Sequence, residues 1–150
     1  MRYFQLFILL TLISCQNVDN KGNKVEEKNF LKDERQKMTK LISACIELPA
    51  LQQYYRNEKP LKQKDLVILE NEFTKGLDSL YKFGNPVKTL NISEIKAKSI
   101  VEYLEFKEIK ISNDSAFVYY RYDVQGVGIK STYLYKVNQW VLLNSHLWEN

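Results

Sequence analysis

The chain has 150 residues, 45% of them hydrophobic, which is enough for one ordinary domain with a buried core and too few for two. Its formal net charge is only +4, and its 22 basic and 18 acidic residues are spread along the chain. A mild and dispersed charge of this kind argues against a nucleic-acid-binding protein, which carries a basic patch.

The first segment, residues 1–14, is typical of a secretory leader. Arg2 supplies a positive charge, residues 3–13 form an apolar run, and Ser14 is a small residue before a cleavage point. A membrane-spanning helix needs roughly 20 apolar residues, and polar residues follow this shorter run at once. We therefore expect the leader to be removed and not to span a membrane.

The four residues from Leu12 to Cys15 resemble the lipobox of bacterial lipoproteins. The resemblance implies that the chain is cut before Cys15 and that the Cys15 thiol receives a diacylglyceryl group. Each buried methylene adds about 0.8 kcal/mol of membrane affinity, so two or three acyl chains would hold the protein in a membrane. Gln16 is similar to the residue that follows the cysteine in enteric lipoproteins of the outer membrane. The expected location is therefore the bacterial cell envelope, and the outer membrane is favoured over the inner membrane. The alternative is an ordinary leader, or a buried first helix, in which Cys15 has no role.

Two elements are predicted to follow the anchor. Residues 15–29 contain many amides and charges and few apolar side chains, so they predict a flexible tether to a single domain of residues 30–150. A first helix is predicted from Phe30 to Leu48, because apolar residues recur there at helical spacing. The apolar face of this helix consists of Met38, Leu41, Ile42 and Cys45. With Cys15 lipidated, Cys45 has no cysteine partner, and its apolar setting predicts a buried and inert thiol.

A second helix is predicted between Pro60 and Gly84. Its apolar residues recur at intervals of three and four, at Leu66, Leu69, Phe73, Leu77 and Leu80. From Val87 to Lys98 the pattern fits either a short helical turn that begins at Ser93 or an edge strand and a loop.

From Ser99 onward the apolar period changes to two, which predicts strands. Turns at residues 113–114, 126–127 and 138–139 divide this part into four strands, and a change of parity near Lys107 predicts a bulge. The three resulting registers agree on one apolar inner face. That face consists of Ile109, Ile111, Ala116, Val118, Tyr120, Tyr122, Val124, Ile129, Tyr133, Tyr135, Val137, Trp140 and Leu142.

The predicted fold class is therefore α+β, with two N-terminal helices packed on a bent antiparallel meander of about four strands. The stretches IKISNDSAFVYYRY and YLYKVNQW resemble a strand pair and the closing hairpin of the cone-shaped nuclear transport factor two-like superfamily. A cystatin-like sheet with a single helix is the alternative. The resemblance implies that the inner face of the sheet lines a cone.

Enzymes of that superfamily are implied to use a carboxylate and a tyrosine or histidine inside the cone. The predicted registers place no acidic residue there. The candidate pocket groups are Tyr120, Tyr122, Tyr133, Tyr135, Asn144 and His146. We expect the tyrosine rings to belong to the core and their hydroxyls to reach the rim. His146, the one histidine of the chain, would be the acid or base of an enzyme or carrier for an apolar small molecule.

One histidine and one further cysteine are too few for a metal site, and no glycine-rich phosphate loop opens a helix, so no cofactor is expected. On the face opposite the predicted pocket, Phe117, Tyr119 and Leu134 are candidate contacts for a protein partner. The sequence thus favours a non-enzymatic lipoprotein that binds a protein partner or a small ligand, for example an immunity or inhibitor protein. The cone-pocket enzyme or carrier is the alternative.

Overall fold

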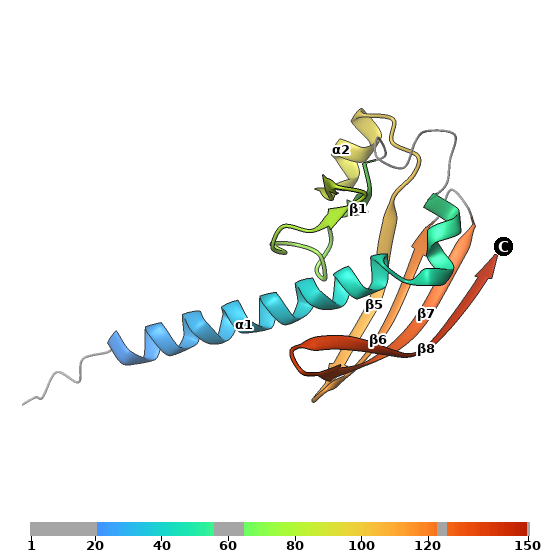
Figure 1. Ribbon diagram of the computed structural model, residues 1–150. Helices are drawn as coiled ribbons and strands as arrows, with labels where there is room; N and C mark the ends of the chain where they lie inside the picture. Colours follow the sequence, from blue (N-terminus) through green and yellow to red (C-terminus); the bar gives the residue numbers. More distant parts are fainter. Residues whose placement is uncertain (1–20, 56–64, 123–125, 150) are drawn as a thin grey trace, which may run out of the picture.

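The computed structural model describes residues 21–55, 65–122 and 126–149, with side chains from Lys32 onward. The architecture is α+β, with one six-stranded sheet and one long helix, α1 (Lys21–Ile46), across one face of the sheet (Figure 1). The strands of the sheet are β1 (Val67–Leu69), β4 (Lys88–Leu90), β5 (Leu104–Ser112), β6 (Ser115–Tyr122), β7 (Val127–Lys136) and β8 (Gln139–Glu149). Their order is β4-β1-β5-β6-β7-β8. The predicted fold class, two helices on a four-stranded meander, is therefore wrong.

Helix α1 covers the inner face of the sheet with its second half. Leu41, Ile42, Cys45 and Ile46 of this half are fully buried, because the apolar residues recur on one side of the helix. The predicted apolar face is thus confirmed. The helix begins at Lys21, before the predicted start, so part of the expected tether is helical. Figure 1 shows the first half of α1 projecting beyond the sheet.

The predicted second helix is not formed over the described residues 65–82, which hold β1, a loop and the short strand β2 (Tyr81–Lys82). The run Val67-Ile68-Leu69 lies between two parallel neighbours, β4 and β5. Ile68 packs in the main core, whereas Val67 packs with Leu90 and Ile95 in a smaller core. A strand buried on both faces shows no alternation, which is why its leucines could be fitted to a helical period.

Short elements complete the domain. The 3-10 helix η1 (Pro49–Tyr55) follows α1, and β2 pairs with β3 (Asn85–Pro86) in a separate hairpin. The helix α2 (Ile92–Ala97) falls in the stretch where a short helical turn was one alternative. Its N-terminus is closed by a capping box, since the Asn91 side chain accepts a hydrogen bond from the Glu94 backbone and the Glu94 side chain accepts one from the Asn91 backbone.

The register of β5 with β6 is the one that the sequence predicted. Ile109 pairs with Val118 and Ile111 with Ala116, and the register shifts between Phe106 and Glu108, where a bulge was expected. The turn at Asn113 and Asp114 is also in place. These predictions are correct because a two-residue turn fixes the register of the two strands, and the alternation of apolar residues in both strands agrees with that register.

The two later registers differ from the prediction. Tyr120 pairs with Ile129 instead of Tyr133, a shift of four residues. An even shift leaves every side chain on its predicted face, since the side-chain period of a strand is two. The predicted turn at residues 126–127 is wrong, because β7 already begins at Val127. Val124, a predicted member of the inner face, lies outside the described residues.

The hairpin between β7 and β8 turns at Val137 and Asn138 instead of at Asn138 and Gln139. Lys136 pairs with Gln139, and Tyr135 pairs with Trp140 instead of Leu142. Both turn residues have positive φ angles, 48° for Val137 and 62° for Asn138, as in a type I′ turn. Asparagine tolerates this conformation, but a β-branched residue is strained in it.

Replacing Val137 with asparagine should therefore stabilise the fold, by about 1 kcal/mol, because the strain of a β-branched residue at positive φ is removed. Val137 is 94% exposed, so no packing is lost. Thermal unfolding followed by circular dichroism measures the change. Val141→Asn is the matched control, since Val141 is also exposed, at 41%, but lies inside strand β8. Equal effects of the two substitutions would contradict the turn strain.

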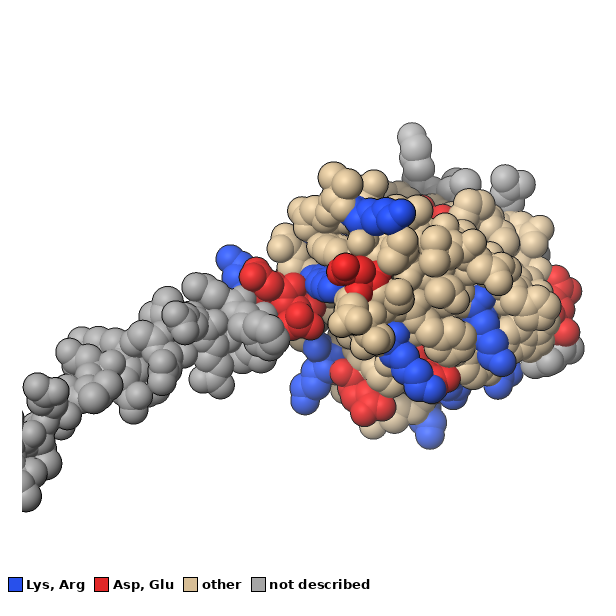
Figure 2. All heavy atoms as spheres, turned by 90° about the horizontal axis from the view of Figure 1, so that it is seen from below, with Lys and Arg blue, Asp and Glu red and all other residues tan. Residues whose placement is uncertain are grey.

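The surface carries both signs of charge. Figure 2 shows basic and acidic side chains interspersed on the face seen from below. Among residues 21–55, 65–122 and 126–149, no helix combines the length and the apolar character needed to span a membrane.

Candidate functional site

Three of the predicted pocket tyrosines belong to the core under α1. Tyr120, Tyr122 and Tyr133 are each at most 1% exposed. The Tyr120 hydroxyl donates to the Cys45 carbonyl at 2.9 Å, and the Tyr122 hydroxyl donates to the Glu102 carboxylate at 3.0 Å. The Tyr120 ring also stacks on Phe106. The side chains that were expected to line a cone therefore fill the space between the sheet and the helix.

A small set of polar atoms is enclosed in this core. The Tyr133 hydroxyl lies among Cys45, Ser131 and Tyr120, yet neither it nor the Ser131 hydroxyl makes a hydrogen bond of good geometry. Burial raises the pKa of the Cys45 thiol to about 12 and also raises the pKa of the Tyr120 and Tyr133 hydroxyls. All three groups are neutral at neutral pH, so Cys45 is a buried thiol without thiolate reactivity.

Tyr120→Phe and Tyr133→Phe should have unequal effects on stability. Tyr120→Phe removes a buried hydrogen bond and leaves the Cys45 carbonyl without that donor, which should cost about 1–2 kcal/mol. Tyr133→Phe removes a buried hydroxyl that has no well-placed partner, so the free energy of unfolding should stay within about 0.5 kcal/mol or rise. Urea unfolding of both variants measures the difference. A larger loss for Tyr133→Phe would contradict this assignment of hydrogen bonds.

Tyr135, the fourth candidate, belongs to the contact between α1 and the β7–β8 hairpin. Its hydroxyl donates to the Asn138 side chain at 2.8 Å, and the Lys37 ammonium lies 4.7 Å from the centre of its ring. The neighbouring Trp140 donates from Nε1 to the Lys37 carbonyl at 2.9 Å. Lys40 Nζ also donates to the Asn138 side chain, at 2.7 Å. These contacts tie the helix to the hairpin.

His146 and Asn144 do not face the tyrosines. The register between β7 and β8 shifts between Thr132 and Tyr133, which pair with Asn144 and Leu142 and leave Leu143 as an extra residue. A bulge of one residue reverses the faces beyond it. His146 consequently pairs with the exposed Lys130, on the outer face of the sheet. The prediction that His146 shares a face with Tyr120 is wrong. The prediction assumed strict alternation along the strand, and the sequence pattern does not show where an extra residue interrupts it.

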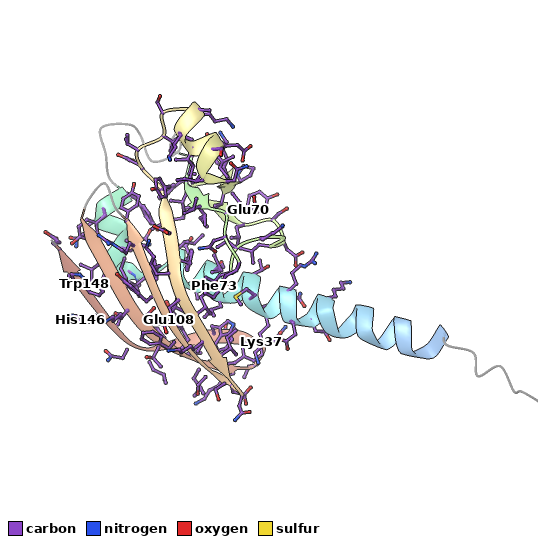
Figure 3. The ribbon with its side chains drawn as sticks, turned by 180° about the vertical axis from the view of Figure 1, so that it is seen from behind. Lys37, Glu70, Phe73, Glu108, His146 and Trp148 are labelled. Carbon is purple, nitrogen blue, oxygen red and sulfur yellow. The ribbon has the colours of Figure 1, made fainter. Side chains whose placement is uncertain are left out.

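On the outer face His146 belongs to a cluster with Trp148, Tyr119 and Lys130, which we call the outer cluster. Figure 3 labels His146 and Trp148 of this cluster. The Trp148 ring stacks on Tyr119 at 5.7 Å and on His146 at 5.8 Å between ring centres. The Lys130 ammonium lies 5.7 Å from the Tyr119 ring and 5.5 Å from the Trp148 ring. Gly128 leaves room for this arrangement, because a Cβ there would lie 2.3 Å from the Trp148 ring.

The three predicted partner contacts all lie on this outer face. Phe117, Tyr119 and Leu134 are half-buried, and Leu134 pairs with Val141 of β8. On the β5 side the surface is charged, and Lys107 pairs with Glu105 and Lys110 with Glu108. The outer face thus combines aromatic and aliphatic side chains over β6 to β8 with ion pairs along β5.

A groove that the sequence did not predict lies between α1 and the start of β8. Its volume is about 310 Å³. It is lined by Lys40, Ser43, Ala44, Glu47, Asn138, Gln139 and Trp140. The helix residues and the hairpin residues are almost a hundred positions apart in the chain, so no local sequence signal could have revealed the groove.

Cys15, the predicted lipid attachment site, lies outside the described residues. Within the described residues no group of three or more metal-ligating side chains comes together. Comparisons with known protein families, with curated proteins and with solved structures found no match. The function is therefore inferred from the sequence and the geometry alone.

Proposed function

We propose that the protein is a lipoprotein of the bacterial cell envelope, held at the outer membrane by lipid on Cys15, and that it is a non-enzymatic module that binds a protein partner. An immunity or inhibitor protein is a specific version of this function. The lipobox-like end of the leader supports the anchor. Two or three acyl chains are enough for stable membrane attachment.

The first half of α1 suits an anchored protein. Residues 32–36 are exposed, and burial begins further along the helix. About 16 helical residues therefore precede the packed part, which corresponds to roughly 24 Å of rigid helix. Such a helix would hold the binding domain away from the lipid headgroups.

The position of the outer cluster is the observation that carries the binding proposal. Tyrosine, tryptophan and arginine are the residues that dominate the energy of protein interfaces. On this face Tyr119 and Trp148 stand beside the partly buried Phe117 and Leu134. The inner face is filled by the core, so the outer face and the adjoining edge at β8 are the parts of the sheet that can meet a partner.

We do not propose an enzyme in which His146 and an inner-face tyrosine act as an acid–base pair. His146 lies beside Lys130 on the outer face, whereas Tyr120 donates to the Cys45 carbonyl in the core. A general acid and base must both come within hydrogen-bond reach of one substrate, and the sheet separates these two.

Detergent-phase partitioning and intact-mass measurement test the anchor. We expect the mature protein in the detergent phase, with a mass that includes a diacylglyceryl group and an acyl chain, and Cys15→Ala in the aqueous phase. A mature chain with a free Cys15 thiol would contradict the anchor.

Photo-crosslinking in intact cells tests the binding face. A crosslinking amino acid in place of Tyr119 should capture a partner protein. The same amino acid in place of Tyr81 is the matched control, because Tyr81 is 64% exposed and lies on β2, outside the main sheet. Equal capture from both positions, or capture from Tyr81 alone, would contradict the assigned face.

A further inference from the structure

The two edges of the sheet are built very differently. One edge is β4, a strand of three residues whose Lys88 is paired with Asp65. Among the described strands, the other edge is β8, a strand of eleven residues that pairs with β7 on one side. Short length and lysine are the usual protection of an edge strand. The β4 edge has both, whereas β8 has no Lys, Arg, Asp or Glu from Gln139 to Trp148.

The β8 edge is also apolar where it is most exposed. Val141 is 41% exposed, Leu142 38% and Leu143 58%. The bulge at Leu143 explains why three consecutive large side chains are exposed here, since the extra residue interrupts the alternation between faces. Figure 1 shows β8 at the margin of the sheet with α1 on its inner side.

The groove lies beside this apolar stretch. Ala44 and Ser43 of α1 form one wall, and Gln139 and Trp140 of β8 form the other. The Lys40 ammonium is bonded to Asn138 and the Glu47 carboxylate to Lys82, so both charged residues of the groove already have partners. A helix beside a free strand edge makes a slot into which an extended segment can be laid as a further strand.

We propose that the β8 edge binds an extended, uncharged segment of another protein, which adds to the sheet as a seventh strand beside α1. This inference rests on the proposed function, since it names the mode by which the anchored module holds its partner. The backbone of the segment hydrogen-bonds to the free edge of β8, which supplies affinity without regard to sequence. Its side chains alternate between the groove at Ala44 and Trp140 and the outer face at Val141. A charge at the centre of the segment would find no opposite charge on β8 and would be desolvated at a cost.

A second copy of this chain is the competing occupant of the edge. Two β8 strands paired antiparallel are related by a two-fold axis perpendicular to the sheet. Because α1 lies across the sheet (Figure 1), that axis would turn the projecting ends of the two α1 helices in opposite directions. The oligomeric state of the purified protein therefore separates such a dimer from a bound segment of another protein.

A random peptide library tests the proposal. The full-length mature protein, purified in detergent, is used to select phage that display peptides of about eight residues, the length of an ordinary strand. We expect the selected peptides to share alternating apolar residues without central charges. A synthetic peptide of the selected sequence should slow amide hydrogen exchange in β8.

Leu143→Lys places a lysine on the edge and should weaken binding of that peptide about tenfold or more. Val137→Lys is the matched control, because it adds the same charge at an exposed apolar position in the hairpin turn. Its affinity should equal that of the unchanged protein. Thermal melting checks that both variants fold.

Several results would overturn the proposal: no selected peptide, a charged consensus, or equal binding to the Leu143→Lys protein. Loss of peptide binding in Tyr119→Ala but not in Leu143→Lys would move the site to the outer cluster. A dimer that Leu143→Lys dissociates would assign the edge to a second copy. None of these readouts depends on the lipid, so the intact mass at Cys15 reports separately on the anchor.

Discussion

Replacing Trp140 with alanine should lower the free energy of unfolding by about 3–5 kcal/mol, the usual cost of removing a large buried aromatic side chain. Trp140 is 7% exposed and packs against Tyr135 at 4.9 Å between ring centres. Its Nε1 donates to the Lys37 carbonyl, and the Lys37 ammonium lies 5.5 Å from its ring. The substitution therefore removes core packing and the link between α1 and the β7–β8 hairpin together. Urea unfolding followed by far-ultraviolet circular dichroism measures the loss.

Trp148→Ala is the control for Trp140→Ala. Both tryptophans lie on β8, but Trp148 is half-buried and stacks on the outer face. We expect a smaller loss of stability from Trp148→Ala, together with the weaker partner binding that the proposed function requires. A greater loss of stability from Trp148→Ala would contradict the view that α1 is attached through Trp140.

Glu47→Ala should cost about 2–3 kcal/mol, because it leaves the buried Lys82 charge without its carboxylate partner. Lys82 Nζ lies 2.7 Å from the Glu47 carboxylate and 2.7 Å from the Gln52 side-chain oxygen, beside the rings of Tyr55 and Phe83. The Lys82 side chain is 4% exposed and that of Glu47 55% exposed. Solvent reaches the carboxylate, so we place the loss below that of a fully enclosed ion pair. Thermal and urea unfolding measure it.

A double-mutant cycle separates the pair from its surroundings. Lys82→Met keeps the volume of the side chain and removes the charge, so the double variant Glu47→Ala, Lys82→Met should be more stable than Glu47→Ala alone. The reason is that no buried charge is then left unpaired. If adding Lys82→Met to Glu47→Ala caused a further loss, the instability of Glu47→Ala would not come from the buried ammonium.

Local patterns predicted several parts of the fold correctly. The buried face of α1 follows from residues three and four apart, and the pairing of β5 with β6 follows from one two-residue turn and an alternating pattern. The bulge near Lys107 is visible as a change of parity between two apolar stretches. Each of these features depends on residues that are close together in the chain.

The errors arose where distant contacts decide between local alternatives. The apolar run at Val67 suits a helix or a buried strand equally well, and it became a strand because β4 and β5 lie on both sides of it. The outer cluster depends on the bulge at Leu143, which places His146 and Trp148 on the outer face instead of the predicted inner face. A register of two strands is a property of their pairing, so no single strand contains it.

By itself, the sequence determined an amphipathic first helix and a series of strands with alternating apolar residues, because each depends on neighbouring side chains alone. Only the tertiary structure decided that β1 lies inside the sheet, that His146 faces outward and that β8 is the edge of the described strands, beside a groove. Those three properties depend on which segments pack against one another. That choice is made by the burial of the whole chain, not by the preference of any one segment.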